Sequence, residues 1–218
     1  TSQSNAQMHH AALRIELGES AQLTLLQEYA CEDQLFFLHN QVVDLELAAN
    51  AKLQHFELQR FAKTASLVSH YRVKQQRDAS WHYCSAQLGA AFSRQAITTD
   101  LIDSAAHCSL IGFAHVDGQR HSDTHILINH AASHTLSQQF FRNLLDDASR
   151  TVFTGKAKVH EGVCSISADQ TNNNLLLSDR AKAFVRPQLE IDADDVPCTT
   201  RAIEVINAFR KDEKKNSD

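Results

Sequence analysis

The sequence lacks the short motifs that mark most nucleotide-binding, zinc-binding and disulfide-stabilised proteins. It contains no CxxC pair, no P-loop, no GxGxxG and no GxSxG. Its cysteines are odd in number and far apart, at Cys31, Cys84, Cys108, Cys164 and Cys198. These absences argue against a zinc motif, a disulfide framework and an ATPase. They favour a chain that works in the reducing cytoplasm.

Long apolar and long basic runs are missing as well. No apolar stretch approaches the roughly 20 residues that a membrane span needs, and the polar start at Thr1–Met8 is unlike a signal peptide. The net charge is −5, and the body of the chain has no block of Lys and Arg. We therefore expect no membrane and no nucleic acid as a partner. Because the first residue is Thr rather than Met, we also expect a fragment or a processed product.

What the sequence does contain is alternation of apolar and polar residues, which predicts strands with one buried face. The alternating apolar positions are Leu13, Ile15 and Leu17; Leu45 and Leu47; Leu67, Tyr71 and Val73; Trp81 and Tyr83; Ile126 and Ile128; Leu175 and Leu177; and Leu189 and Ile191. The six glycines and two prolines are few for a protein built of tight hairpins. Corners made of ordinary residues favour a solenoid over a meander.

Small polar corners recur between these strands at an interval of about 30 residues. Each contains an alanine, at positions 21, 51, 79, 105, 148 and 181. A repeat of this length fits a β-solenoid, in which each coil buries its apolar face against the next. The spacing between positions 105 and 148 is longer than the others, and we expect it to hold a helix.

Helical spacing is predicted in two places. Phe140, Phe141, Leu144 and Leu145 form an i, i+4 stripe after Ser137, and Ala202, Ile206 and Phe209 form another. We thus expect an all-β solenoid over residues 1–198 with one or two short helices. Residues 199–218 include nine charged side chains and are expected to form a tail that is partly disordered.

Two histidine patterns are candidate metal sites. In a strand, His121, Asp123 and His125 share one face and could bind Zn or Fe. The same residues equally fit the polar outer face of a solenoid, and we weight that interpretation more heavily. His130 and His134 have the spacing of the HExxH zinc helix but lack its Glu, so we expect a structural role there.

Several stretches of residues 121–198 resemble the core domain of the SufB/SufD family of iron–sulfur cluster assembly proteins. They are His121–Ala131, His134–Ser137, Val152–Lys156 and Gln170–Ser178, with Arg186–Ile191, Ala193–Val196 and Cys198 the most specific. Residues 1–120 fit the earlier coils of the same domain with weaker motifs. The general run of the sequence is closer to the SufD type than to the SufB type.

The resemblance implies a right-handed parallel β-helix that acts as a scaffold and is not an enzyme. Its expected partners are a SufB-like subunit, joined edge to edge, and a SufC-like ATPase that docks on a helical region after the solenoid. A homodimer is expected when the chain is alone, because exposed strand edges favour pairing with a copy. The resemblance also implies that an iron–sulfur cluster is built at the subunit interface. We expect no cluster to be held stably by this chain alone.

The chain departs from the family pattern at the end of the core. Cys198 stands at the family cysteine and is a weak candidate metal ligand, but Thr200 replaces the family histidine and Arg201 the following glycine. A truncated or frame-shifted product would look like this. The departure puts the ligand histidine and the SufC-like docking region in doubt and leaves the fold prediction unaffected.

Two other classes of function remain open. One is a metal-dependent hydrolase or cupin-like enzyme that uses His121, Asp123 and His125. The other is a left-handed β-helix acyltransferase, which needs hexapeptide repeats that the sequence does not show.

Overall fold

The computed structural model describes residues 7–31, 36–192 and 198–206 of the 218. These residues form fourteen strands in two parallel seven-stranded sheets. Sheet A consists of β1 (Gln7–Leu17), β3 (Phe37–Leu47), β5 (Ser66–Gln75), β7 (Phe92–Leu101), β9 (His121–His130), β11 (Arg150–Val159) and β13 (Lys182–Ile191). Sheet B consists of β2 (Gln22–Ala30), β4 (Lys52–Arg60), β6 (Ser80–Gln87), β8 (His107–Val116), β10 (Leu136–Leu145), β12 (Ser167–Leu176) and β14 (Cys198–Ile206).

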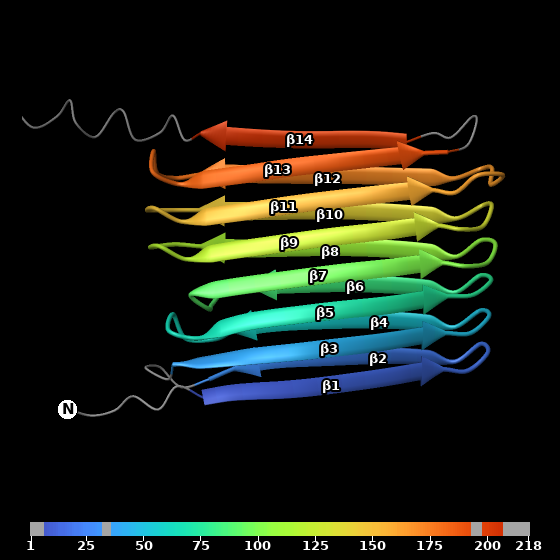
Figure 1. Cartoon of the computed structure of the whole chain (residues 1–218), viewed down its shortest axis with the longest axis horizontal. Coiled ribbons are helices and arrows are strands. Elements are labelled where there is room, and N and C mark those ends of the chain that lie inside the picture. The colour runs from blue at the N-terminus through green and yellow to red at the C-terminus, as the bar shows by residue number, and fades with distance from the viewer. Residues whose placement is uncertain (1–6, 32–35, 193–197, 207–218) are drawn as a thin grey trace, which may run out of the picture.

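The chain winds as a right-handed β-solenoid. In Figure 1 the odd strands lie in front and point right, and the even strands lie behind and point left, while the chain rises from β1 to β14. Each coil therefore adds one strand to each sheet, and every strand pairs in parallel with the strand of the next coil. The predicted fold class is confirmed.

The hydrophobic core fills the space between the two sheets. Along each strand alternate side chains point inward, and equivalent positions of successive coils stack in columns. In sheet A, Leu45 pairs with Val73, which pairs with Thr99, and all three side chains are buried. Sheet B contributes the fully buried rings of Trp81 and Tyr83. The alternation in the sequence is thus the inside–outside pattern of a solenoid.

The predicted corners lie at turns of the solenoid, and most need a left-handed backbone. Ser20, Asn50, Asp78, Ala105 and Asp147 each have φ between 54° and 60°. The long interval between the corners at 105 and 148 has a different cause from the one expected. The first four corners follow sheet A strands, whereas the corner at 147 follows strand β10 of sheet B.

The helix predicted after Ser137 is wrong. Residues Leu136–Leu145 form strand β10, in which Phe141 and Leu145 are buried and Phe140 and Leu144 lie on the outer face. Because this strand has apolar side chains on both faces, its pattern imitates an i, i+4 stripe. The strand assignment is clear, because β10 pairs with β8 and β12 along its whole length.

The second predicted helix is also wrong where the structure describes it. Ala202 and Ile206 lie in strand β14, which pairs with residues Ala168–Leu176 of β12. Phe209 lies outside the described residues, as does the rest of the expected tail after 206. Strand β14 crosses the boundary drawn at 198, because the last coil of sheet B provides a template for one more parallel strand. Within the described ranges, no helix is long and apolar enough to cross a membrane.

Candidate functional site

The polar face of β9 brings together two of the three residues expected to bind metal. Asp123 is buried, with Arg94 Nη1 3.3 Å from its Oδ2 and His125 Nε2 2.8 Å from its Oδ1. His121 instead stacks on the ring of Phe92, with centroids 5.7 Å apart. In the part of the chain that the structure describes, no group of three or more His, Cys, Asp and Glu could hold a metal ion. The geometry supports a structural role for Asp123, whose negative charge is balanced by Arg94 on the neighbouring strand.

His130 and His134 do not share a helix. His130 ends β9 with its ring fully buried, and its two nitrogens lie 2.8 Å from the Thr135 hydroxyl and 2.9 Å from the Ser137 hydroxyl. Burial lowers the pKa of His130 to about 4, so the ring stays neutral near pH 7. His134 lies in the following turn with φ of 62°. The buried, hydrogen-bonded ring of His130 fits the structural role expected for it, and for His134 that role stays a prediction.

Cys198 lies at the start of β14, the last strand of sheet B. Its backbone pairs with Ala168 of β12, and Thr200 pairs with Gln170. Ala168 and Gln170 are both buried. The side chains of residues 198–206 lie outside the described part of the chain, so the role of Cys198 as a metal ligand stays a prediction.

The other four cysteines are free thiols in different surroundings. Cys108 is fully buried, and burial raises the pKa of its thiol to about 12, which makes it an inert core residue. Cys84 and Cys164 are exposed, and Cys31 is half-buried. No disulfide joins the described cysteines, as the odd count and wide spacing indicated.

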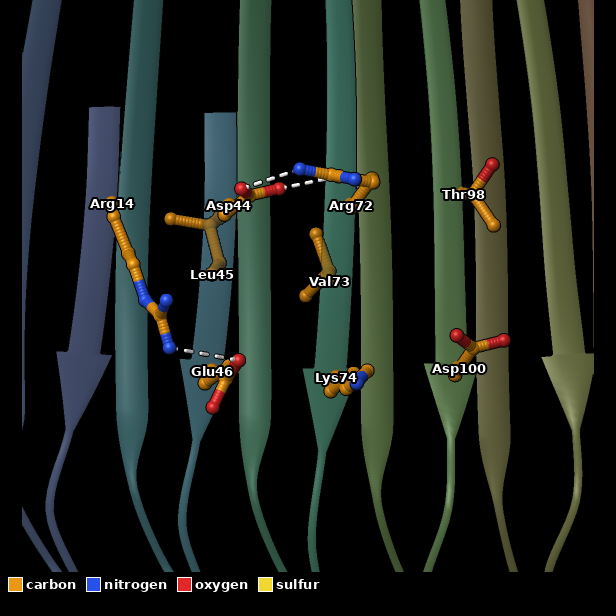
Figure 2. A pocket seen from close by; sticks show the side chains of 9 residues that line it. All are labelled: Arg14, Asp44, Leu45, Glu46, Arg72, Val73, Lys74, Thr98 and Asp100. Atoms are coloured by element: carbon orange, nitrogen blue, oxygen red, sulfur yellow. Dashed lines mark hydrogen bonds and ion pairs between the residues drawn. The ribbon is translucent and has the colours of Figure 1, made fainter. Parts of the chain in front are cut away.

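A charged hollow of about 330 Å³ lies on the outer face of sheet A (Figure 2). Arg72 donates to both carboxylate oxygens of Asp44, at 2.5 and 2.6 Å, and these contacts hold the pKa of Asp44 below its usual value. Arg14 lies 3.5 Å from Glu46 across the neighbouring strands. This cluster was not predicted from the sequence, because its members are about 30 residues apart along the chain. The nearly equal spacing of Arg14, Asp44 and Arg72 in the sequence was the signal that could have revealed the cluster.

A second cluster missed from the sequence lies between the sheets. The buried carboxyl of Glu57 accepts hydrogen bonds from the Tyr71 hydroxyl and, at 3.3 Å, from Gln95 Nε2. Gln95 also donates to the Tyr83 hydroxyl at 2.6 Å. Burial raises the pKa of Glu57 to about 7. This network ties β4 of sheet B to β5 and β7 of sheet A.

Comparison with known proteins relates the chain to iron–sulfur cluster assembly. It is 28% identical over 211 residues to a SufBD family iron–sulfur cluster assembly protein of Synechocystis, covering 92% of this chain and 46% of the relative. It is 27% identical over 190 residues to the iron–sulfur cluster assembly protein SufD of Escherichia coli, covering 87% and 45%. The chain thus spans about half the length of these relatives.

A shorter similarity points to a different assembly. Over 59 residues the chain is 49% identical to one of the subunits of the aspartyl/glutamyl-tRNA(Asn/Gln) amidotransferase of Prochlorococcus marinus, covering 27% of this chain and 61% of the relative. This similarity covers only about a quarter of the chain, so it does not show that the chain belongs to that protein's family.

The broadest match is to a protein family. The sequence model of the SufBD core domain, described as SUF system FeS cluster assembly, matches residues 1–203. That range contains thirteen of the fourteen strands in full and most of β14. The chain therefore belongs to the SufBD core-domain family, within which it is SufD-like.

Proposed function

We propose that this chain is a scaffold subunit of an iron–sulfur cluster assembly complex and is not an enzyme. The observation that carries the proposal is the match of the SufBD core-domain family over residues 1–203. The relatives from Synechocystis and E. coli are both named as iron–sulfur cluster assembly proteins. The solenoid also suits a scaffold, because its stacked coils form long flat faces on a rigid core.

The proposed partners are a SufB-like subunit, which meets the open end of the solenoid, and a SufC-like ATPase. The end at β13 supports the first contact. Leu189 stands in the same column as the buried Ile128 and Ala157, yet it is 40% exposed. Leu189 lies on the last sheet A strand that the structure describes, and no described coil packs over it. Among the described residues, the core column and the edge of β13 have no neighbouring strand, and both features are suited to pairing with a second solenoid.

The cluster is the cargo of the proposed complex, and Cys198 is the residue of this chain that we propose to contribute to its site. A single thiolate does not hold a cluster, because Fe–S clusters are normally bound by four protein ligands. We therefore propose that the partner supplies the remaining ligands and that the chain works in the reducing cytoplasm. The metal-hydrolase alternative has no third ligand beside Asp123 and His125 among the described residues.

Co-purification tests this function. The tagged chain is expressed with the SufB-like and SufC-like subunits of its own organism under anaerobic conditions. Both subunits should be retained in a defined complex. Leu189→Asp should abolish capture of the SufB-like subunit, whereas Ile102→Asp, an equally exposed apolar residue at a corner, should not. Failure of the unsubstituted, folded chain to retain either subunit would contradict the proposal.

A further inference from the structure

The balance of charge on the outer face of sheet A changes along the solenoid. On strands β1, β3, β5 and β7, four Lys and Arg side chains face outward together with four Asp and Glu side chains. On β11 and β13, near the top of Figure 1, five Lys and Arg side chains face outward with a single acid, Glu190. Lys156 and Lys158 both form ion pairs with Glu190. Positive charge is therefore concentrated on two strands of a chain whose net charge is −5.

The other three cations on these two strands are exposed and have no acidic partner in the described part of the chain. They are Arg150 on β11 and Lys182 and Arg186 on β13. Arg150 and Lys182 are direct neighbours in the register of the two strands. Like charges directly opposite each other in a sheet are destabilising. An anion that binds between them removes this repulsion.

An exposed aromatic ring lies among these cations. Phe184 faces outward between Lys182 and Arg186 on β13 and is 46% exposed. Its register neighbour on β11 is Val152, which also faces outward. We call Arg150, Val152, Lys182, Phe184 and Arg186 the basic patch. It combines an apolar centre with positive charge on two sides.

We propose that the basic patch binds an extended acidic segment of a partner protein, in which two carboxylates flank an apolar residue. Alternate residues of a strand are about 6.7 Å apart on one face, so Lys182 and Arg186 stand roughly 13 Å apart with Phe184 midway between them. An extended segment with Asp or Glu at positions i and i+4 and an apolar residue at i+2 has the same spacing. This pattern is the same in both chain directions, so the segment fits parallel or antiparallel to β13.

The limits of the basic patch favour a short acidic segment over a long polyanion. Asp123 of β9 is the register neighbour of Val152 on one side, and Glu190 lies further along β13. Nucleic acid also combines phosphates with bases that stack on aromatic rings. Its phosphate chain continues past the site, however, and meets these two carboxylates. A protein segment of about five residues contacts Lys182, Phe184 and Arg186 and ends before it reaches them.

The basic patch is separate from the surface proposed for the SufB-like subunit. Leu189 stands at the end of a core column on the inner side of β13, whereas Phe184 faces outward from the same strand. Binding of an acidic segment therefore leaves the core column of β13 uncovered. The inference goes beyond the scaffold role and holds whether or not the chain acts in iron–sulfur cluster assembly.

Fluorescence anisotropy with a labelled synthetic peptide tests the proposal. The probe carries the sequence Glu-Thr-Leu-Thr-Glu between neutral flanks, and the unsubstituted chain is titrated into it at low salt. The dissociation constant should be on the order of 100 μM or lower and should rise with salt. A probe with Lys in place of both Glu residues should not bind, and one with Ser in place of Leu should bind about tenfold more weakly. Failure of the folded chain to bind the acidic probe would overturn the proposal.

Charge-reversal variants test where the probe binds. Lys182→Glu and Arg186→Glu should each weaken binding about tenfold or more. The matched control is Lys74→Glu, which makes the same change in charge on β5 of the same face, and it should leave the affinity nearly unchanged. Equal losses for Lys74→Glu would mean that the probe responds only to net charge, which would contradict the proposal.

Aromatic variants test the apolar centre. Phe184→Ser should weaken binding about tenfold, as the loss of a central apolar contact does. Phe56→Ser removes a ring of similar exposure from the outer face of sheet B and should have no effect. Both side chains are exposed, so neither change should alter the unfolding curve of the chain by much. Binding that is insensitive to Phe184→Ser would contradict the proposed contact.

A charge swap and a competitor complete the test. Arg186→Glu should regain affinity for a probe in which one Glu is replaced by Lys. No recovery in the swap would overturn the proposed register. A single-stranded oligonucleotide of mixed sequence should compete poorly with the acidic probe, and tighter binding of the oligonucleotide through Lys182 and Arg186 would overturn the proposal in favour of nucleic acid. All of these measurements use the chain alone, so their outcome does not depend on whether it binds SufB-like and SufC-like subunits.

Discussion

The two outer faces of the solenoid have opposite chemistry, although the same coils build both. On sheet A, charges pair from strand to strand: Arg72 with Asp44, Arg94 with Asp123, and Lys156 with Glu190. On sheet B, the equivalent positions carry Leu26, Phe56, Ile111 and Phe113, and Arg60 with Glu28 is the ion pair found there among the described residues.

The two faces differ in how well their outward side chains suit contact with water. The pairs Arg72–Asp44 and Lys156–Glu190 on sheet A are partly exposed, and such pairs remain in water at little cost. On sheet B, the side chains of Leu26, Phe56, Ile111 and Phe113 leave apolar area in water, which is unfavourable. In a solenoid, one residue change per coil, about 30 residues apart, alters one whole column of side chains on a face.

The largest expected effect is the difference in stability loss between a substitution on the inner face of sheet B and one on its outer face. Trp81 is fully buried, and Trp81→Ala should lower the free energy of unfolding by about 3–5 kcal/mol. Phe56→Ala on the outer face of the same sheet should cost less than about 1 kcal/mol. Both are measured by urea unfolding at high dilution, so that association does not contribute. Similar losses for both variants would mean that Phe56 is buried within the chain in solution, which would contradict the difference between the two faces of sheet B.

The next effect concerns the polar network that joins the two sheets. The folded-state pKa of Glu57 is raised to about 7 from a usual 4.5, so the stability it favours is complete below pH 4.5 and is lost as pH rises to 7. Glu57→Gln should remove this fall, which amounts to about 3 kcal/mol at most. Unfolding curves between pH 4 and 8 measure it as the difference between the two proteins, which cancels other titrating groups. An unchanged difference across that range would show that Glu57 is ionised in the fold.

The smallest effect belongs to the charged face. Arg72→Gln should lower the melting temperature slightly at low salt, and the loss should disappear in 1 M NaCl, because exposed pairs are screened. The matched change on the other face, Phe56→Gln, should show no such salt dependence. A loss for Arg72→Gln that persists in high salt would mean that the pair is structural rather than a solvated surface contact.

The sequence predicted the solenoid because alternation and corner spacing are local signals that survive in a single chain. Leu45 and Leu47, or Trp81 and Tyr83, show the inward positions directly. The helix prediction at Phe140 failed because the outer face of β10 is apolar, which hides the period of two. The secondary-structure prediction was therefore misled by Phe140 and Leu144, the apolar side chains on the outer face of β10.

The candidate site was harder to predict than the fold. Asp44 and Arg72 form a bidentate pair only because the register places residues 28 positions apart side by side. Glu57 appears in the sequence as an ordinary surface charge, and only the closed coil shows it buried under Tyr71. His121 was grouped with Asp123 and His125 by strand parity, but parity does not reveal the ring of Phe92 that His121 stacks on.

The iron content of the chain, alone and in complex, tests the central claim most directly. After anaerobic reconstitution with iron and sulfide, the chain alone should bind no stoichiometric cluster, because Cys198 is one thiolate without the family histidine at Thr200. The complex with a SufB-like subunit should bind a cluster, and Cys198→Ser in this chain should reduce its yield. A brown chain that holds stoichiometric iron and sulfide on its own, and loses both in Cys198→Ser, would contradict the scaffold account.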